Sequence, residues 1–169
     1  MNALCALAIA CAWGLNLADA ARALHGFEPL ELRGRIVRKG GWLIIDDSYN
    51  ASPDAVKRAL EMLSFGVGER VAVIGHMREL GDAAGPLHFE VGKSVAEAAD
   101  ILVAVGDFAE ETKRGAVFVG MDEANIFVAS DWRDALDIVE SVVSGEATVL
   151  VKGSRLVGLD RLGGALEDG

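Results

Sequence analysis

The sequence predicts an α/β protein with a doubly wound, mainly parallel, Rossmann-like sheet preceded by a helical hairpin. The main observation is that apolar runs ending in small or polar residues alternate with amphipathic stretches after about residue 40, as in βα units. The chain has 169 residues, of which 51% are hydrophobic. This is enough for one domain with a sizeable core and a smaller appendage.

The charge and cysteine content narrow the class of protein. A formal net charge of -10 and a pI near 4.7 disfavour a broad surface for nucleic acid or anionic lipid, because negative potential repels polyanions. Cys5 and Cys11 lie in an apolar helical stretch without metal-ligand spacing, so we expect buried thiols and a cytoplasmic protein. The apolar run over residues 3–13 follows no Lys or Arg and is too short to span a bilayer.

The first thirty residues predict two helices. Residues 2–13 form the pattern of a buried helix, whose covering partner lies either in this chain or outside it. Asn16 is a suitable N-cap for a helix over residues 17–25, and Gly26 suits a left-handed C-terminal stop. Residues 27–32 are the predicted linker, where we place the domain boundary.

The chain is organised around residues 42–53, Trp-Leu-Ile-Ile-Asp-Asp-Ser-Tyr-Asn-Ala-Ser-Pro. An isoleucine-rich run bounded by glycine and polar residues predicts a buried strand. A helix follows, with Ser52 as N-cap and Pro53 at its first position. Open α/β sheets bind ligands where strands end at such loops. The first site candidates are therefore Asp46, Asp47, Ser48, Tyr49 and Asn50.

The pattern then repeats to the end of the chain. An extended piece over residues 33–38 precedes the first buried strand, and further strands are predicted at 71–74, 101–105, 117–119 and 148–151. Helices are predicted at 54–63, 87–99, 108–114 and 132–143. Right-handed crossovers gather the loops that follow parallel strands along one edge of the sheet, and this edge is the predicted working face.

Several loop residues have both a functional and a structural interpretation. Asp46 and Asp47 could hold a ribose or a metal, or could cap the loop and the helix. Lys152, Ser154 and Arg155 suit a carboxylate or a phosphate. Arg33 and Arg35 either share a face or form a solvated edge.

The glycine-bracketed loop over residues 75–81 is either a ligand loop or a tight turn. His76 and His88 lack a third ligand at a recognisable spacing, so no metal site is predicted. The sequence contains neither G-x-G-x-x-G after the first strand nor G-x-x-x-x-G-K-[ST]. Any nucleotide chemistry must then be shared with another domain. A non-catalytic Rossmann-like binding module is the alternative function that the sequence also allows.

Four stretches together resemble the C-terminal part of a bacterial Mur ligase. They are Asp-Asp-Ser-Tyr-Asn-Ala-Ser-Pro at 46–53, Gly-His-Met-Arg-Glu-Leu-Gly at 75–81 with His88 after it, Val-Ala-Val-Gly at 103–106, and Leu-Val-Lys-Gly-Ser-Arg at 150–155. The opening Asn2-Ala3-Leu4 is similar to the end of a motif in the central ATP-binding domain of that family. Two positions depart from the family pattern, with His76 in place of aspartate and Ser52 in place of asparagine.

The resemblance implies roles for single residues. Asn2 corresponds to the asparagine that contacts adenine, Arg35 to the arginine that reaches the nucleotide phosphates, and Asp47 to the aspartate that binds the ribose. A second set matches the loops near the incoming amino substrate and comprises Tyr49, Asn50, Lys152, Ser154 and Arg155.

The resemblance is strongest to the ligases that join D-alanyl-D-alanine to UDP-N-acetylmuramoyl-tripeptide, and it implies an ATP-dependent reaction through an acyl phosphate. Residues 1–32 then correspond to the end of the central domain with its linker, and residues 33–169 to the C-terminal domain. The catalytic residues, the phosphate loop and Mg²⁺ would belong to a preceding domain, so we expect this chain alone to be inactive and monomeric. Another Mur ligase or a folylpolyglutamate synthase relative is the alternative within the enzyme class.

Overall fold

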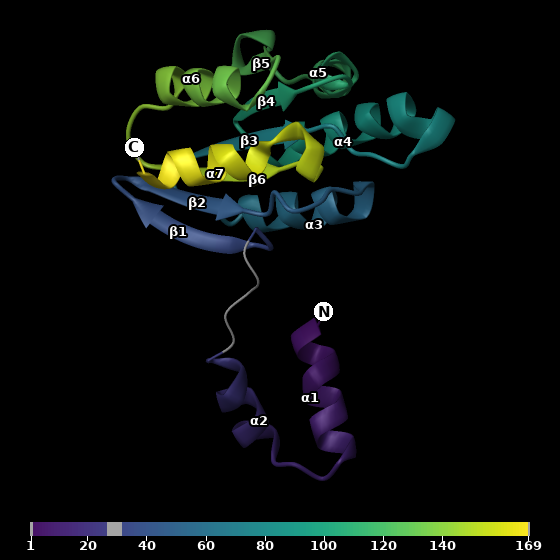
Figure 1. Ribbon diagram of the computed structural model, residues 1–169, viewed down its shortest axis with the longest axis vertical. Coiled ribbons are helices and arrows are strands. Elements are labelled where there is room, and N and C mark those ends of the chain that lie inside the picture. The colour runs from purple at the N-terminus through teal and green to yellow at the C-terminus, as the bar shows by residue number, and fades with distance from the viewer. Residues whose placement is uncertain (1, 27–31, 169) are drawn as a thin grey trace. The chain divides into compact units, whose positions relative to one another are not determined.

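The computed structural model describes residues 2–26 and 32–168. The chain divides into two compact units, Met1–Leu30 and Glu31–Gly169 (Figure 1). Each unit is described by itself. No helix in the described ranges is long and apolar enough to cross a membrane.

The first unit is a hairpin of α1 (Asn2–Ala12) and α2 (Leu17–Leu24). The Asn16 cap is confirmed, since its side-chain oxygen accepts hydrogen bonds from the N–H groups of Ala18 at 2.9 Å and Asp19 at 3.2 Å. The left-handed stop at Gly26 is wrong: α2 ends at a right-handed His25. It is Gly14, in the turn between the helices, that has a positive φ of 79°.

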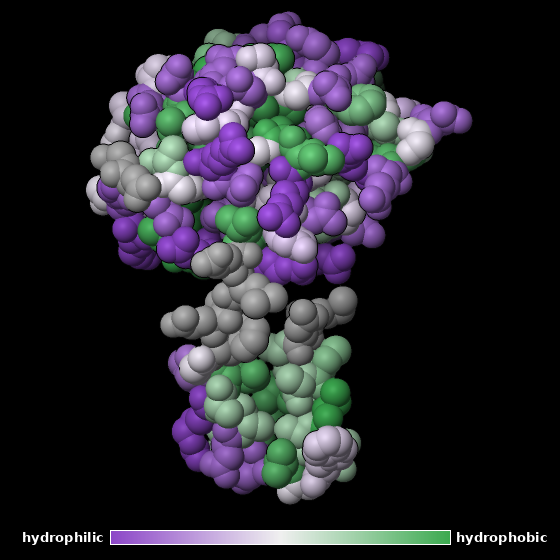
Figure 2. Space-filling model, in the orientation of Figure 1, coloured by the Kyte–Doolittle hydropathy of each residue, from purple (hydrophilic) through white to green (hydrophobic). Residues whose placement is uncertain are grey.

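The predicted helix α1 is not buried within this unit, so α2 is not the covering partner that its apolar pattern implies. Trp13, just after α1, is 81% exposed, and Leu4, Ile9 and Leu15 are also exposed. Cys5 and Cys11 are free thiols as expected, but both are exposed. The eight-residue α2 itself has no buried residue, so the two helices do not enclose a core. Figure 2 shows the resulting apolar surface on these two helices.

The second unit contains one six-stranded sheet in the order β1-β2-β6-β3-β4-β5. Its strands are β1 (Arg35–Lys39), β2 (Trp42–Asp46), β3 (Glu69–Gly75), β4 (Ile101–Val105), β5 (Ile126–Ala129) and β6 (Ala147–Lys152). The edge strand β1 pairs antiparallel with β2, and all other pairs are parallel. The predicted fold class is confirmed.

Helices cover both faces of this sheet (Figure 1). One core cluster joins the sheet to α3 (Pro53–Leu63), α4 (Ala84–Ala98) and α5 (Ala109–Phe118). The other cluster joins the opposite face to α6 (Trp132–Val142) and α7 (Leu159–Asp168). The predicted start of α3 is confirmed, because Ser52 is the N-cap and Pro53 occupies the first turn.

Two parts of the sequence-based prediction need correction. Residues 117–119 are not a strand: α5 continues to Phe118, and the chain turns at Gly120, where φ is 98°. The strand instead is β5, which pairs with β4. A three-residue apolar run does not distinguish a strand from the end of a helix. The helix α7 was not predicted, although Leu159, Leu162 and Leu166 are buried at helical spacing.

Candidate functional site

The carboxyl ends of β2, β6 and β3 lie side by side in the sheet. The helices that follow β2 and β3 pack on one face, whereas α7, which follows β6, packs on the other. In α/β proteins, ligands bind where the carboxyl ends of adjacent strands meet and their helices diverge in this way, and we call this junction of the three strand ends the crevice. Hydrogen bonds join these segments: the N–H of Asp47, after β2, donates to the carbonyl of Val151 in β6 at 2.9 Å, and the N–H of Ser154, after β6, donates to the carbonyl of His76, after β3, at 3.2 Å.

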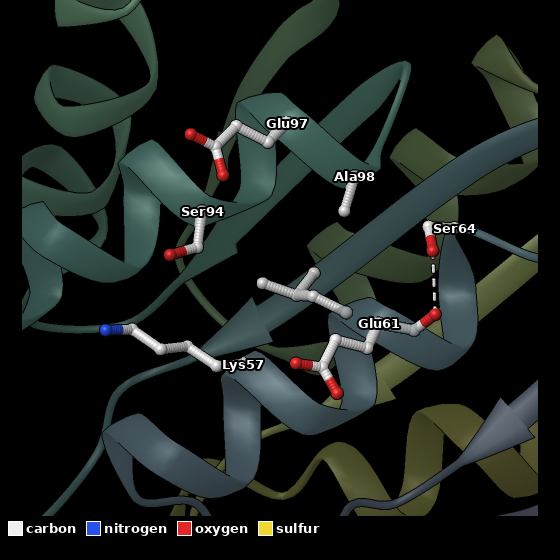
Figure 3. Close-up of a pocket in the computed structure, with 7 residues that line it drawn as sticks. Lys57, Glu61, Ser64, Ser94, Glu97 and Ala98 are labelled. Carbon is white, nitrogen blue, oxygen red and sulfur yellow. Dashed lines mark hydrogen bonds between the residues drawn. The ribbon is translucent and has the colours of Figure 1, made fainter.

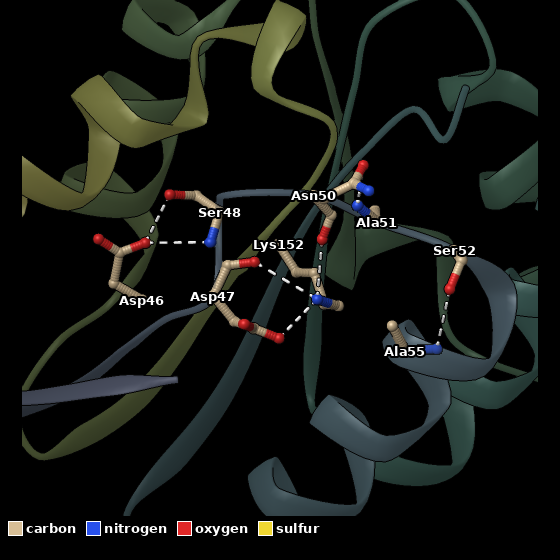
Figure 4. A network of polar contacts seen from close by, with 8 residues as sticks. All are labelled: Asp46, Asp47, Ser48, Asn50, Ala51, Ser52, Ala55 and Lys152. Atoms are coloured by element: carbon tan, nitrogen blue, oxygen red, sulfur yellow. Dashed lines mark hydrogen bonds and ion pairs between the residues drawn. The ribbon is translucent and has the colours of Figure 1, made fainter. Parts of the chain in front are cut away.

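The centre of this crevice is an ion pair between Lys152 and Asp47. Lys152 is the last residue of β6 and is only 2% exposed. Its Nζ lies 2.5 Å from Asp47 Oδ2, 3.4 Å from the Asp47 carbonyl and 3.1 Å from the Asn50 carbonyl (Figure 4). The ion pair therefore ties the end of β6 to the loop after β2.

The structure separates the two neighbouring aspartates. Asp46 is 1% exposed, and its Oδ1 accepts hydrogen bonds from the Ser48 hydroxyl at 2.6 Å and the Ser48 N–H at 3.1 Å (Figure 4). Burial raises the pKa of the Asp46 carboxyl, although the Ser48 hydrogen bonds and Arg35 oppose the shift. Asp46 therefore shapes the loop, whereas the side chain of Asp47 keeps 27% exposure and faces the crevice.

Tyr49 and Asn50 are both exposed on this loop. The Tyr49 ring lies under the guanidinium of Arg33, at 4.2 Å from its centroid, a cation–π contact. The side-chain oxygen of Asn50 accepts from the N–H of Ala51 at 2.9 Å. Two loop positions thus present polar groups that a small substrate can reach.

Arg35 pairs with an acidic side chain, whereas Arg33 contacts the Tyr49 ring. The guanidinium of Arg35 forms a two-pronged ion pair with Glu167 of α7, with nitrogen–oxygen distances of 3.1 Å. Lys39 of the same strand donates to the main-chain carbonyl of Glu167. The side chain of Arg35 is 49% exposed, so a phosphate could approach it only in competition with Glu167.

His88 is hydrogen-bonded to the glycine-bracketed loop over residues 75–81. Its Nε2 accepts from the N–H of Met77 at 2.8 Å, and its Nδ1 donates to the Ala84 carbonyl at 2.7 Å. The ring stacks on Phe108 with centroids 4.5 Å apart. Burial lowers the pKa of His88, which keeps the ring neutral and able to accept. His88 is therefore a structural residue, a role that the sequence analysis did not assign.

Two polar atoms near the crevice are buried without a partner among the described residues: His76 Nδ1 and Ser154 Oγ. The nearest acid to His76 is Asp107, whose Oδ2 lies 4.0 Å from Nδ1. Within residues 2–26 and 32–168, no three His, Cys, Asp or Glu side chains form a group suited to a metal ion.

Two open hollows lie beside the strand ends of the crevice, and a third lies between two helices. One of about 390 Å³ is formed by the loop over residues 76–81 with Asp107, Phe108 and Leu156. Another of about 550 Å³ is lined by Trp132, the exposed Arg155 and residues 156–158, 160 and 161. A third, of about 260 Å³, lies between α3 and α4 and includes Lys57, Ser64 and Ala98 (Figure 3). Ser64 and Ala98 lie at the C-terminal ends of these helices, and none of the residues that line this hollow belongs to the Lys152–Asp47 network.

The family model that matches this chain is "Mur ligase, glutamate ligase domain", over residues 32–155. The chain belongs to the Mur ligase family. The UDP-N-acetylmuramoyl-tripeptide--D-alanyl-D-alanine ligase of Bacillus subtilis is 29% identical over 96% of this chain, and that of Mycobacterium leprae is 32% identical over 99%. The chain spans 36% and 35% of these two relatives, about a third of their length.

Solved Mur ligase structures match the chain in the same way. Acinetobacter baumannii MurF superposes with a TM-score of 0.84 at 30% identity, covering 99% of this chain and 37% of that one. Thermotoga maritima MurF ligase in complex with ADP has a TM-score of 0.76 at 27% identity, covering 95% and 36%. These neighbours confirm the recognition of the C-terminal part of a Mur ligase from its motifs.

Not all of the predicted site residues come together in this Mur ligase domain. Asp47, Asn50 and Lys152 meet in one network, and Ser154 joins the same crevice through its backbone. Arg35 is engaged by Glu167 at the edge strand, a partner that lies 132 residues away in sequence. Asn2 begins α1 in the other unit, and its side chain lies outside the described residues. Glu167 carried no recognisable motif, so the sequence offered no signal for it.

Proposed function

We propose that this chain is the C-terminal part of an ATP-dependent ligase that joins D-alanyl-D-alanine to UDP-N-acetylmuramoyl-tripeptide in peptidoglycan precursor synthesis. The observation that carries this proposal is the match of nearly the whole chain to ligases named for that reaction. The structure of a relative in complex with ADP supports the use of ATP. The crevice at the end of β6 supports a ligand site in this part of the enzyme.

In this proposal residues 1–32 end the central ATP-binding domain and form the linker, and residues 33–169 form the domain that receives the dipeptide. ATP and Mg²⁺ are held mainly by the rest of the ligase. From this chain, Asn2 contacts adenine, Asp47 binds the ribose, and Arg35 reaches the phosphates after it leaves Glu167. The dipeptide is contacted by Tyr49, Asn50, Ser154 and Arg155.

The reaction proposed is transfer through an acyl phosphate. The terminal carboxylate of the tripeptide attacks the γ-phosphorus of ATP, and ADP leaves. The free amine of D-alanyl-D-alanine then attacks the acyl carbon, so that a C–N bond forms, the C–O bond to phosphate breaks, and the amine loses a proton. Such transfers are accelerated chiefly by positioning and by charge stabilisation.

This domain contributes position and enclosure rather than a nucleophile. The exposed Arg155 forms a two-pronged contact with the dipeptide carboxylate, which aligns the amine at the other end of the molecule. Closure of the domain as a rigid body excludes water, which would otherwise hydrolyse the acyl phosphate.

The test uses the full-length protein that contains this chain, supplied with ATP, Mg²⁺, the UDP-linked tripeptide and D-alanyl-D-alanine. We expect one phosphate released for each UDP-linked pentapeptide, with both products measured by mass spectrometry and a phosphate assay. Omission of the dipeptide should abolish amide formation. Residues 1–169 alone should give no turnover. Absence of pentapeptide from an otherwise ATP-binding protein would refute the proposed reaction and favour a non-catalytic binding module.

A further inference from the structure

The surroundings of Lys152 suggest a different role from that of a substrate contact. An ammonium group has three protons to donate, and Lys152 has three oxygen acceptors from the loop after β2. The residue is 2% exposed. An incoming carboxylate could therefore reach this ammonium only by displacing one of its present partners.

A buried ion pair is a costly way to join two loops. Removing two charges from water opposes folding, and apolar residues of similar size often give equal or greater stability. The geometry of the Lys152 pair is specific: both the carbonyl and the carboxylate of Asp47 converge on one nitrogen (Figure 4). Such an arrangement determines where the carboxylate points.

The ion pair leaves part of Asp47 available to a ligand. Lys152 contacts Oδ2, and within the described residues no donor reaches Oδ1 of Asp47. The Asp47 side chain is 27% exposed, in contrast to the buried ammonium. A carboxylate held by one oxygen presents the other as an acceptor, which suits a hydroxyl of a ligand.

We propose that Lys152 is a positioning residue, which orients the carboxylate of Asp47 toward the nucleotide ribose and touches neither substrate. This inference rests on the proposed function for the identity of the ligand. Carboxylate recognition in the same loop then belongs to the exposed Arg155, three residues further along the chain.

The first test is a kinetic comparison in the full-length ligase. Lys152→Met should raise the KM for ATP by about tenfold to a hundredfold, the loss expected when one charge-assisted hydrogen bond to the ligand is no longer aligned. The KM for D-alanyl-D-alanine should change less than twofold. Lys57→Met is the matched control, because Lys57 is exposed on α3 and lines the hollow between α3 and α4 (Figure 3); it should alter neither constant.

Two further variants separate positioning from a general loss of folding. Asp47→Asn should raise the KM for ATP to a similar extent, and the double variant should be no worse than the more severe single one. Lys152→Arg retains the charge in a larger, planar group, and it should also weaken ATP rather than the dipeptide. A rise in the dipeptide KM with an unchanged ATP KM, in either Lys152 variant, would overturn the proposal.

A structural measurement tests the ion pair without any reference to the reaction. In residues 1–169 labelled with ¹⁵N-lysine, the Lys152 ammonium should give a protected NMR cross-peak, because buried and hydrogen-bonded protons exchange slowly with water. Absence of a protected peak would refute the ion pair and with it the positioning role. If the peak is present and the full-length wild-type protein makes no pentapeptide, the proposed function fails while the ion pair stands.

Discussion

Gly163 of α7 packs directly against the carboxylate of Asp46, and its substitution by alanine tests how tightly this contact is built. A Cβ added at Gly163 would lie 2.7 Å from Asp46 Oδ2 and 2.9 Å from Asp46 Cγ. The carboxylate has little freedom to move, since its Oδ1 is held by two Ser48 hydrogen bonds in a buried site. The neighbouring Gly164 has no heavy atom within 4 Å of an added Cβ, which makes it a matched control.

The expected magnitude follows from two opposing terms. Replacing glycine by alanine inside a helix stabilises it by about 1 kcal/mol, and this gain applies to both positions. Overpacking a buried contact costs about 1–3 kcal/mol, and this cost applies only at Gly163. The difference in the free energy of unfolding between Gly163→Ala and Gly164→Ala should therefore be about 1–3 kcal/mol, with Gly164→Ala the more stable protein.

Urea denaturation of both variants, followed by circular dichroism at pH 7, measures this difference. The melting temperatures should differ by between about 2 and 12 °C for a chain of this size. In an Asp46→Ala background the two glycine variants should become equally stable, because the clashing carboxylate is gone. Equal stability in the presence of Asp46 would refute the packing described for α7.

Three further predictions concern groups with shifted pKa values. Burial raises the pKa of Asp46 above 3.8. The stability that this group contributes is therefore fully present below pH 3.8 and is lost as the pH rises through the folded-state pKa. In urea titrations, Asp46→Asn should gain stability relative to wild type between pH 4 and 7. His88→Ala should cost about 1–3 kcal/mol of stability at pH 7, since the buried Met77 N–H loses its acceptor. Because burial lowers the pKa of His88, the wild type should also lose stability as the pH falls below 6.5. Thermal melts from pH 7 downward would measure both effects. The hydrogen bond from Arg70 lowers the pKa of Asp100 below 3.8, so Asp100→Asn should cost at most about 1 kcal/mol at neutral pH, and acid denaturation should show this cost vanishing as the pH falls through the lowered pKa.

Local signals in the sequence were sufficient for many single elements. The Ser52-Pro53 pair marks the start of α3 because capping and the fixed φ of proline act within one turn of helix. Buried parallel strands such as β4 are recognisable from their continuous apolar runs. The error at residues 117–119 arose where an apolar run was too short to distinguish the end of a helix from a strand.

The candidate site was likewise predictable from local sequence patterns only in part. The position of its loops was predictable, because parallel strands bring their carboxyl ends to one edge, and the family motifs included both Asp47 and Lys152. Their contact was not predictable from local pattern, because the two residues are 105 positions apart and spacing alone left Asp46 and Asp47 equivalent.

By itself, the sequence determined the α/β class, the order of most βα units and the family. Only the tertiary structure decided that Asp46 is buried against α7, that Asp47 is held by Lys152, and that Arg35 is paired with Glu167. The physical reason is that caps and hydrophobic periodicity act over a few neighbouring residues. Burial, charge pairing and helix packing instead depend on which distant segments the completed sheet brings together.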